Sequence, residues 1–123
     1  MLQSSQSLGA FYQCYKNPAS FIRAIKSFQT YYPSNDIVVV SDGGHNYKDF
    51  CDDNNIHYVY KTKEDAETIG LMFNSYHQCL NFLRNLWYSF DHIKEDYILL
   101  IEDDVRVLKQ HTSKFNYSIN GCN

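Results

Sequence analysis

The sequence has no long hydrophobic run, no cluster of basic residues and no closely spaced pair of cysteines, and each absence excludes a class of protein. Its apolar runs fall far short of the roughly 20 residues that a membrane-spanning helix needs. Lys and Arg total 11 against 14 Asp and Glu, so the net charge of -3 gives no basic surface for nucleic-acid phosphates. The sequence therefore predicts neither a membrane span nor a nucleic-acid partner.

Cysteine is scarce and scattered. The cysteines at positions 14, 51, 79 and 122 have neither the paired spacing of a zinc site nor the density of a disulfide scaffold. Residues 1–7 are polar and contain no basic segment followed by an apolar one, so no secretory signal is predicted. A reduced, cytoplasmic setting is therefore expected.

Aromatic side chains, by contrast, are plentiful. Tyr, Phe and Trp number 11, 8 and 1, which is 16% of the 123 residues. That much ring surface argues against a disordered chain. The length suffices for one domain with a single modest core and excludes two full domains.

Strand-like apolar runs alternate with segments of helical periodicity. The runs cover residues 8–15, 36–41, 56–60 and 96–101. Asn17-Pro18 predicts a helix start, Asn46 is expected to cap a short helix, and residues 70–90 predict a long one. The buried face predicted for this long helix consists of Phe73, Tyr76, Leu80, Leu83, Trp87 and Phe90. The alternation predicts an α/β fold: a Rossmann-like open, mostly parallel sheet with helices on both faces.

Polar residues follow three of the predicted strands directly. In an open parallel sheet, ligands bind outside the carboxyl ends of the strands, where the strand order reverses. The fold would therefore bring together three groups that are distant in sequence. These groups are Tyr15-Lys16-Asn17, Asp42-Gly43-Gly44 and Glu102-Asp103-Asp104.

The acidic triplet is the strongest chemical signal. Carboxylates are ligands for Mg²⁺ or Mn²⁺, which keep one or two protein carboxylates while phosphates and water fill the other positions. The alternative interpretation is an acidic turn exposed to solvent. The position directly after a buried strand favours the metal site, because it fixes the acids at the edge where ligands bind.

The other two groups have structural alternatives as well. Gly43 and Gly44 could let a ligand approach the backbone while Asp42 accepts hydrogen bonds from a base or ribose, or the three could form a simple turn. Tyr15 could stack on a base and Lys16 could offset phosphate charge, or both could be surface residues at a strand end. No G-x-G-x-x-G or G-x-x-x-x-G-K-[ST] motif is present.

In their order and spacing, these segments resemble the amino-terminal, nucleotide-sugar-binding half of GT-A glycosyltransferases. The resemblance covers about residues 9–107, from the first strand to the run that ends in Glu102-Asp103-Asp104. This triplet looks like the D-x-D motif of the family with Glu in the first position, as in some N-acetylglucosaminyltransferases. The resemblance implies a metal-dependent hexosyl- or N-acetylhexosaminyltransferase.

The same resemblance implies roles for individual residues. Asp104 would coordinate Mn²⁺ or Mg²⁺, while Glu102 and Asp103 would hold the ribose or the water ligands of the metal. The Tyr15-Lys16-Asn17 loop, Asp42 and the two glycines would bind the nucleotide of a nucleoside-diphosphate sugar, most commonly a uridine donor in that family. The acceptor would be a glycan, a protein or a lipid.

The end of the sequence departs from the family pattern. Only 19 residues follow Asp104, none of them Asp or Glu, so no general base is identified. On this interpretation, residues 1–123 form a single partial domain without the acceptor-binding part. A non-catalytic nucleotide-binding or interaction module derived from a truncated glycosyltransferase is the alternative. A metal-dependent phosphoryl-transfer domain is disfavoured because the first strand ends without an acid.

Overall fold

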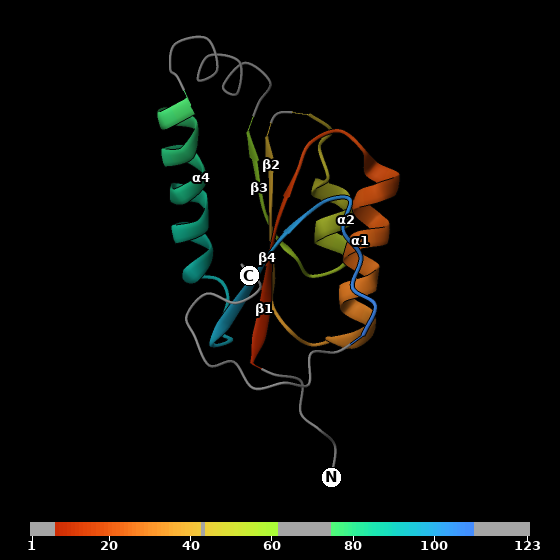
Figure 1. The fold of residues 1–123 in the computed structure, drawn as a ribbon. Helices are drawn as coiled ribbons and strands as arrows, with labels where there is room; N and C mark the ends of the chain where they lie inside the picture. The colour runs from red at the N-terminus through yellow and green to blue at the C-terminus, as the bar shows by residue number, and fades with distance from the viewer. Residues whose placement is uncertain (1–6, 43, 62–74, 110–123) are drawn as a thin grey trace.

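The computed structural model describes residues 7–42, 44–61 and 75–109 (Figure 1). In chain order its elements are β1 (Leu8–Cys14), α1 (Pro18–Tyr31), β2 (Ile37–Asp42), α2 (Lys48–Asp53), β3 (His57–Lys61), α4 (Ser75–Phe90) and β4 (Tyr97–Glu102). All four predicted strands are confirmed, and the long helix is confirmed over Ser75–Phe90, while residues 70–74 lie outside the described part. None of the helices described is long and apolar enough to cross a bilayer.

The strands form one parallel sheet in the order β3-β2-β1-β4. β1 is central, and its Phe11 is paired in register with Val38 on one side and Leu100 on the other. Figure 1 shows α1 and α2 on one face of this sheet and α4 on the opposite face. The predicted Rossmann-like open α/β sheet with helices on both faces is thus confirmed.

Helix α1 begins where the sequence predicts. The side chain of Asn17 accepts a hydrogen bond from the Ser20 N–H at 3.2 Å, and Pro18 occupies the first turn, where its missing N–H costs nothing. The apolar residues of α1 then recur on one face and pack against the sheet. This face buries Phe21, Ala24, Ile25 and Phe28.

Each face of the sheet has its own apolar cluster. Between the sheet and α1, Tyr12 is fully buried, and its hydroxyl donates to the Ala24 carbonyl at 3.2 Å. On the α4 face, the Phe11 ring meets the Phe82 ring edge-on, with centroids 5.8 Å apart. The aromatic excess of the sequence is thus partly explained by rings that bridge sheet and helix.

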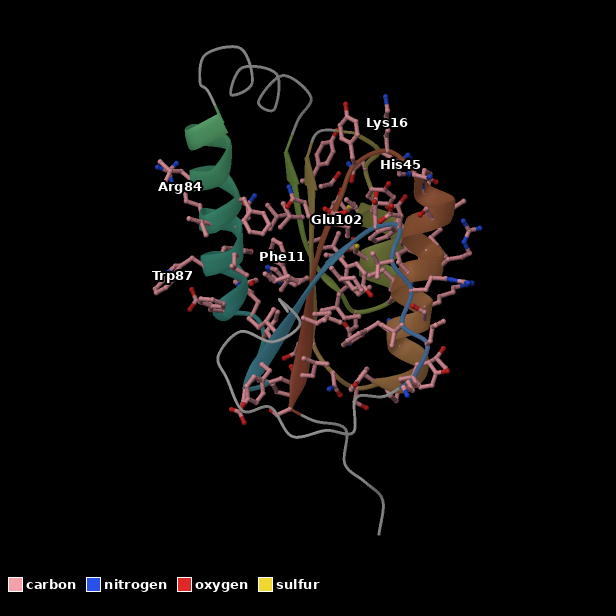
Figure 2. The ribbon with its side chains drawn as sticks, viewed as in Figure 1. Phe11, Lys16, His45, Arg84, Trp87 and Glu102 are labelled. Carbon is pink, nitrogen blue, oxygen red and sulfur yellow. The ribbon has the colours of Figure 1, made fainter. Side chains whose placement is uncertain are left out.

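The predicted buried face of α4 is wrong at three of its positions, whereas Leu80 is half-buried and the side chain of Tyr76 lies outside the description. Leu83, Trp87 and Phe90 are 54%, 72% and 46% exposed, and Figure 2 shows Trp87 pointing away from the sheet. The helix instead turns a neighbouring stripe toward β1 and β2, and this stripe contains Phe82, Asn85, Leu86 and Ser89. Apolar residues lie on two adjacent stripes of this helix, so periodicity alone could not choose between them. Phe73 lies outside the described residues.

The buried stripe of α4 includes an unsatisfied polar group. Asn85 is 9% exposed, and its Nδ2 has no hydrogen-bond partner among the residues described. A buried amide without partners costs about 1–3 kcal/mol. Asn85→Leu should therefore raise the free energy of unfolding by about 1 kcal/mol, measured by urea denaturation. The matched variant Asn85→Asp should lower it, and a destabilised Leu variant would contradict this account.

The short helix α2 begins one residue later than predicted. Its N-cap is Tyr47, whose side chain makes no capping bond. The expected cap, Asn46, instead accepts from the Lys48 N–H at 3.0 Å, two residues further on. The Tyr47 ring packs against Phe21 of α1, with ring centroids 4.2 Å apart.

A cluster of rings joins β3 to the end of α4. The His57 ring stacks on His92, and its Nε2 shares a hydrogen bond with the Tyr88 hydroxyl. Burial, and then the neighbouring His92, lower the pKa of His57 below its usual value. The unfolded chain therefore binds the proton more readily, so His57 contributes stability above about pH 6.5 that is lost as the pH falls toward the folded-state pKa.

Thermal unfolding of the wild type at pH 8, 6.5 and 5 should show this loss on acidification. His57→Gln should flatten the curve between pH 6.5 and 5. An unchanged slope in that variant would exclude His57 as the group responsible.

Candidate functional site

The order of the strands creates a crevice between β1 and β4. From β1 the chain passes to β2 and β3 on one side and returns to β4 on the other side. Ligands of open parallel sheets bind at such a reversal, beyond the carboxyl ends of the strands. A pocket of ≈ 290 Å³ opens there, lined by Gln13, Cys14, Tyr15, Glu102, Asp103 and Asp104. The structure thus brings Tyr15 together with the whole acidic triplet.

The main chain of Tyr15 joins the loops that follow three strands. Its N–H donates to Asp103 Oδ2 at 3.3 Å. Its carbonyl accepts from the His45 N–H at 2.8 Å and from the Tyr47 hydroxyl at 3.4 Å. The Tyr15 ring is 47% exposed, which leaves a face on which a base can stack.

Gly44 allows the loop after β2 to approach Tyr15. A Cβ at Gly44 would lie 2.3 Å from the Tyr15 carbonyl oxygen and 2.6 Å from its carbon. Because Gly44 has no side chain, its backbone can lie against the backbone of Tyr15. Asp42 ends β2 at the same edge of the sheet. Gly43 lies outside the described residues.

Lys16 and Asn17 have local partners. The Lys16 Nζ lies 5.3 Å from the centroid of the Tyr15 ring, in cation–π range. Figure 2 shows Lys16 and His45 together above the carboxyl edge of the sheet. The Asn17 side-chain oxygen accepts from the Ser20 N–H, so it caps α1. Lys16 therefore lies beside the Tyr15 ring and does not itself line the pocket, whereas Asn17 has a structural task.

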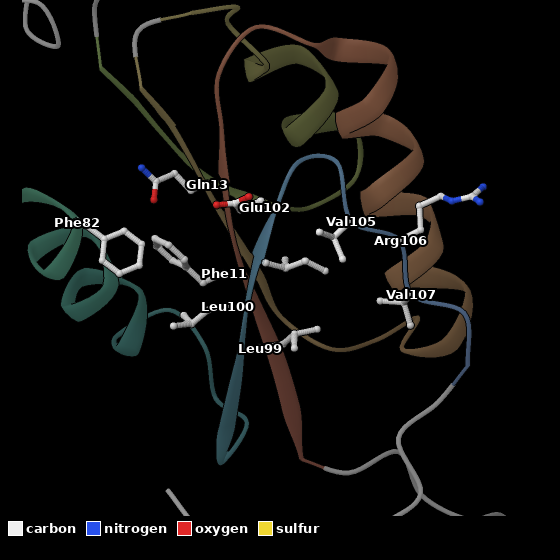
Figure 3. Close-up of a pocket in the computed structure, with 10 residues that line it drawn as sticks. Phe11, Gln13, Phe82, Leu99, Leu100, Glu102, Val105, Arg106 and Val107 are labelled. Carbon is white, nitrogen blue, oxygen red and sulfur yellow. The ribbon is translucent and has the colours of Figure 1, made fainter. Parts of the chain in front are cut away.

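The three acids occupy three different environments. Glu102 ends β4 in register with Gln13, and both side chains project to the α4 side of the sheet (Figure 3). Asp103 is partly buried. Its carboxylate accepts a hydrogen bond from the Tyr15 N–H, and its carbonyl oxygen accepts one from the Ser20 hydroxyl at 2.8 Å. Asp104 is exposed and makes no ion pair or hydrogen bond with another described residue.

A divalent cation fits this arrangement only if the substrate supplies further ligands. No group of three or more His, Cys, Asp or Glu side chains suited to a metal occurs in residues 7–42, 44–61 and 75–109. The uncommitted carboxylate of Asp104 offers the hard oxygen ligand that Mn²⁺ and Mg²⁺ accept. The residues therefore fit an ion shared with phosphates, and not an ion enclosed by protein ligands.

The Tyr47 hydroxyl and the His45 backbone N–H hold the Tyr15 carbonyl in the site, although neither residue is among the site residues predicted from the sequence. Tyr47 is 2% exposed, and burial, with smaller contributions from Cys14 and Asp103, raises the pKa of its hydroxyl above the usual range. The hydroxyl therefore stays protonated and can donate to Tyr15. The only sequence signal for this role was the position of both residues just after Asp42-Gly43-Gly44.

A second hollow runs along the edge of the sheet beside β4. It measures ≈ 580 Å³, and Figure 3 shows its apolar walls on both sides of the strand. Phe11, Phe82 and Leu100 line the side of α4, and Leu99, Val105 and Val107 line the side of α1. This hollow lacks the acids of the β1–β4 crevice apart from Glu102 at its end.

Comparison of the chain with protein-family models, with curated proteins and with solved structures finds no significant match.

Proposed function

We propose that this chain is the nucleotide-sugar-binding region of a metal-dependent glycosyltransferase, and that the nucleoside diphosphate of the donor lies in the crevice between β1 and β4. The observation that supports this most is the pocket shared by Tyr15 and the acidic triplet at the reversal of strand order. The preferred donor is a uridine diphosphate sugar. The acceptor is a glycan, a protein or a lipid.

In this proposal each residue has a separate task. The Tyr15 ring stacks on the base, and Lys16, beside it, offsets phosphate charge. Asp42 and Glu102 accept hydrogen bonds from the base or ribose. Asp103 fixes the Tyr15 backbone, and Asp104 holds the cation together with the diphosphate.

The cation, Mn²⁺ or Mg²⁺, supplies Lewis-acid stabilisation of the leaving nucleoside diphosphate when it is bound. The chain's own residues position the diphosphate and the base. The burial of Cys14 and Cys51 as thiols fits the reducing cytoplasm in which we place the protein.

The second candidate is a non-catalytic module that binds nucleotides or a partner protein. It is favoured by large apolar side chains left exposed on α4 and after β4, with Trp87 72% and Leu108 76% exposed. Transfer or hydrolysis of a nucleotide sugar by the purified chain would exclude this candidate.

Calorimetric titration of the chain with uridine diphosphate tests the proposal. Binding should be at least about tenfold tighter with Mn²⁺ than with a chelator, because Asp104 and the phosphates would hold the ion together. Mn²⁺ alone should bind weakly, since the proposal assigns it one protein carboxylate, and uridine should show no Mn²⁺ dependence. Equal affinity for the diphosphate with and without Mn²⁺ would contradict the proposal.

A further inference from the structure

A polar pocket lies on the other side of Asp104, between α1 and the segment that follows β4. It measures ≈ 420 Å³ and is lined by Ser20, Arg23, Asp104 and Arg106. The two guanidinium groups are always charged. Against the single carboxylate they leave the lining with one net positive charge.

Two hydrogen bonds set the position of this pocket. The Ser20 hydroxyl donates to the Asp103 carbonyl at 2.8 Å, and the Val107 N–H donates to the Ser27 hydroxyl at 2.7 Å. Together they hold the chain after β4 along α1, as Figure 1 shows. In the sequence, Arg106 lies between Asp103 and Val107, the two hydrogen-bonded residues after β4. Arg23 lies between Ser20 and Ser27, their partners on α1.

The orientation of the arginines agrees with this placement. Ser20 and Arg23 are three residues apart on α1, so they share one face of that helix. Figure 3 shows the Arg106 guanidinium on the α1 side of β4, at the end of a side chain that also lines the apolar hollow beside that strand. Neither guanidinium has an ion pair with another residue of the described ranges.

We infer that this pocket is a phosphate-binding subsite that works without a metal ion. Both arginines are exposed at their positions and line one pocket, where their like charges repel each other, and a phosphate group with a charge near -2 relieves that repulsion. Each guanidinium offers a planar fork of donors that matches two phosphate oxygens. A carboxylate has one negative charge and two oxygens, so it can pair with only one of the two guanidinium forks.

The subsite stands apart from the nucleotide crevice, and its existence does not require the proposed function. Asp104 forms the wall between the two pockets, and its charge has opposite effects in them. In the crevice its carboxylate attracts a cation, whereas in the arginine pocket it repels an anion. Removal of this charge should therefore weaken cation binding in the crevice and tighten anion binding in the arginine pocket.

Titration of the full chain with inorganic phosphate, with a chelator present and at constant ionic strength, tests the inference. The Nε–H NMR signals of Arg23 and Arg106 should shift saturably. Arg23→Gln and Arg106→Gln should each weaken phosphate binding about tenfold. Arg106→Lys should recover part of the loss, because it keeps the charge but not the fork.

The matched control is Arg84→Gln, because Arg84 is an exposed arginine on α4, on the opposite face of the sheet. It should bind phosphate like the wild type, and Asp104→Asn should bind it several-fold more tightly. Equal shifts at Arg84, equal affinity for acetate, or unchanged binding when Arg23 and Arg106 are both replaced would overturn the inference.

A further arm identifies where the phosphate comes from. Uridine diphosphate with Mn²⁺ either displaces phosphate from the arginines or binds together with it. Displacement assigns the subsite to the terminal phosphate of the nucleotide, and simultaneous binding assigns it to a second, phosphorylated molecule. Because the phosphate titration contains neither metal nor nucleotide, its failure is distinct from failure of the proposed function.

Discussion

Asp104→Asn is expected to lower the affinity for uridine diphosphate in the presence of Mn²⁺ by about 100-fold. The carboxylate is exposed at the end of the crevice and makes no ion pair with another described residue, so it can serve as a metal ligand. An amide keeps the shape but loses the negative charge that a hard divalent cation needs. Affinity measured with a chelator should stay the same or rise slightly, because a negative charge next to the phosphates is removed.

The control for this variant is Asp53→Asn, which removes an exposed acid at the end of α2. It changes the net charge equally and should leave binding unaltered. Asp103→Asn should act differently from both, since Asp103 accepts from the Tyr15 N–H and its loss should lower stability as well as affinity. A Mn²⁺ dependence that survives in Asp104→Asn would show that another group holds the ion.

The fold could be predicted from the sequence because each strand is marked by a local pattern of residue types along the chain. The continuous apolar run over residues 37–40 marks a strand covered on both faces, and Asn17 followed by Pro18 marks the start of α1. The position of the acidic triplet could be predicted for the same reason, since its first residue ends β4 and all the strands run the same way.

The orientation of α4 could not be predicted in this way. Its sequence places apolar side chains on adjacent stripes, and the stripe that is buried is the one whose Phe82 meets Phe11 of β1. That contact joins residues 71 positions apart, and no local pattern contains it. The consequence is an exposed flank with Leu83 and Trp87, which periodicity had assigned to the core.

The architecture of the site was only partly predictable as well. The three acids look equivalent in the sequence, but the structure separates them into a strand end, a structural acceptor and an exposed carboxylate with no ion pair or hydrogen bond to another described residue. Asp103 becomes an acceptor because the Tyr15 N–H meets it, and Arg106 lines one pocket with Arg23 because Ser20 and Ser27 tether the chain that follows β4. Tertiary contacts determine these differences, and spacing in the sequence gives no sign of them.

Gly44→Ala is expected to lower the free energy of unfolding by about 1–3 kcal/mol, the usual cost of forcing a methyl group into packed structure. The new Cβ would lie 2.3 Å from a backbone oxygen, and backbone cannot move aside as a flexible side chain can. The loop after β2 must therefore retreat from Tyr15, which breaks or lengthens the 2.8 Å bond from the His45 N–H. Chemical denaturation measures this loss.

The same substitution should also weaken nucleotide binding by about tenfold or more, because the Tyr15 backbone links the loops after β2 and β4. His45→Ala is the matched control: it deletes a neighbouring side chain but keeps the N–H that donates to Tyr15. It should cost well under half of the stability that Gly44→Ala costs and leave binding nearly intact. If Gly44→Ala is as stable as the wild type and binds the nucleotide normally, the contact between this loop and Tyr15 does not hold the crevice together.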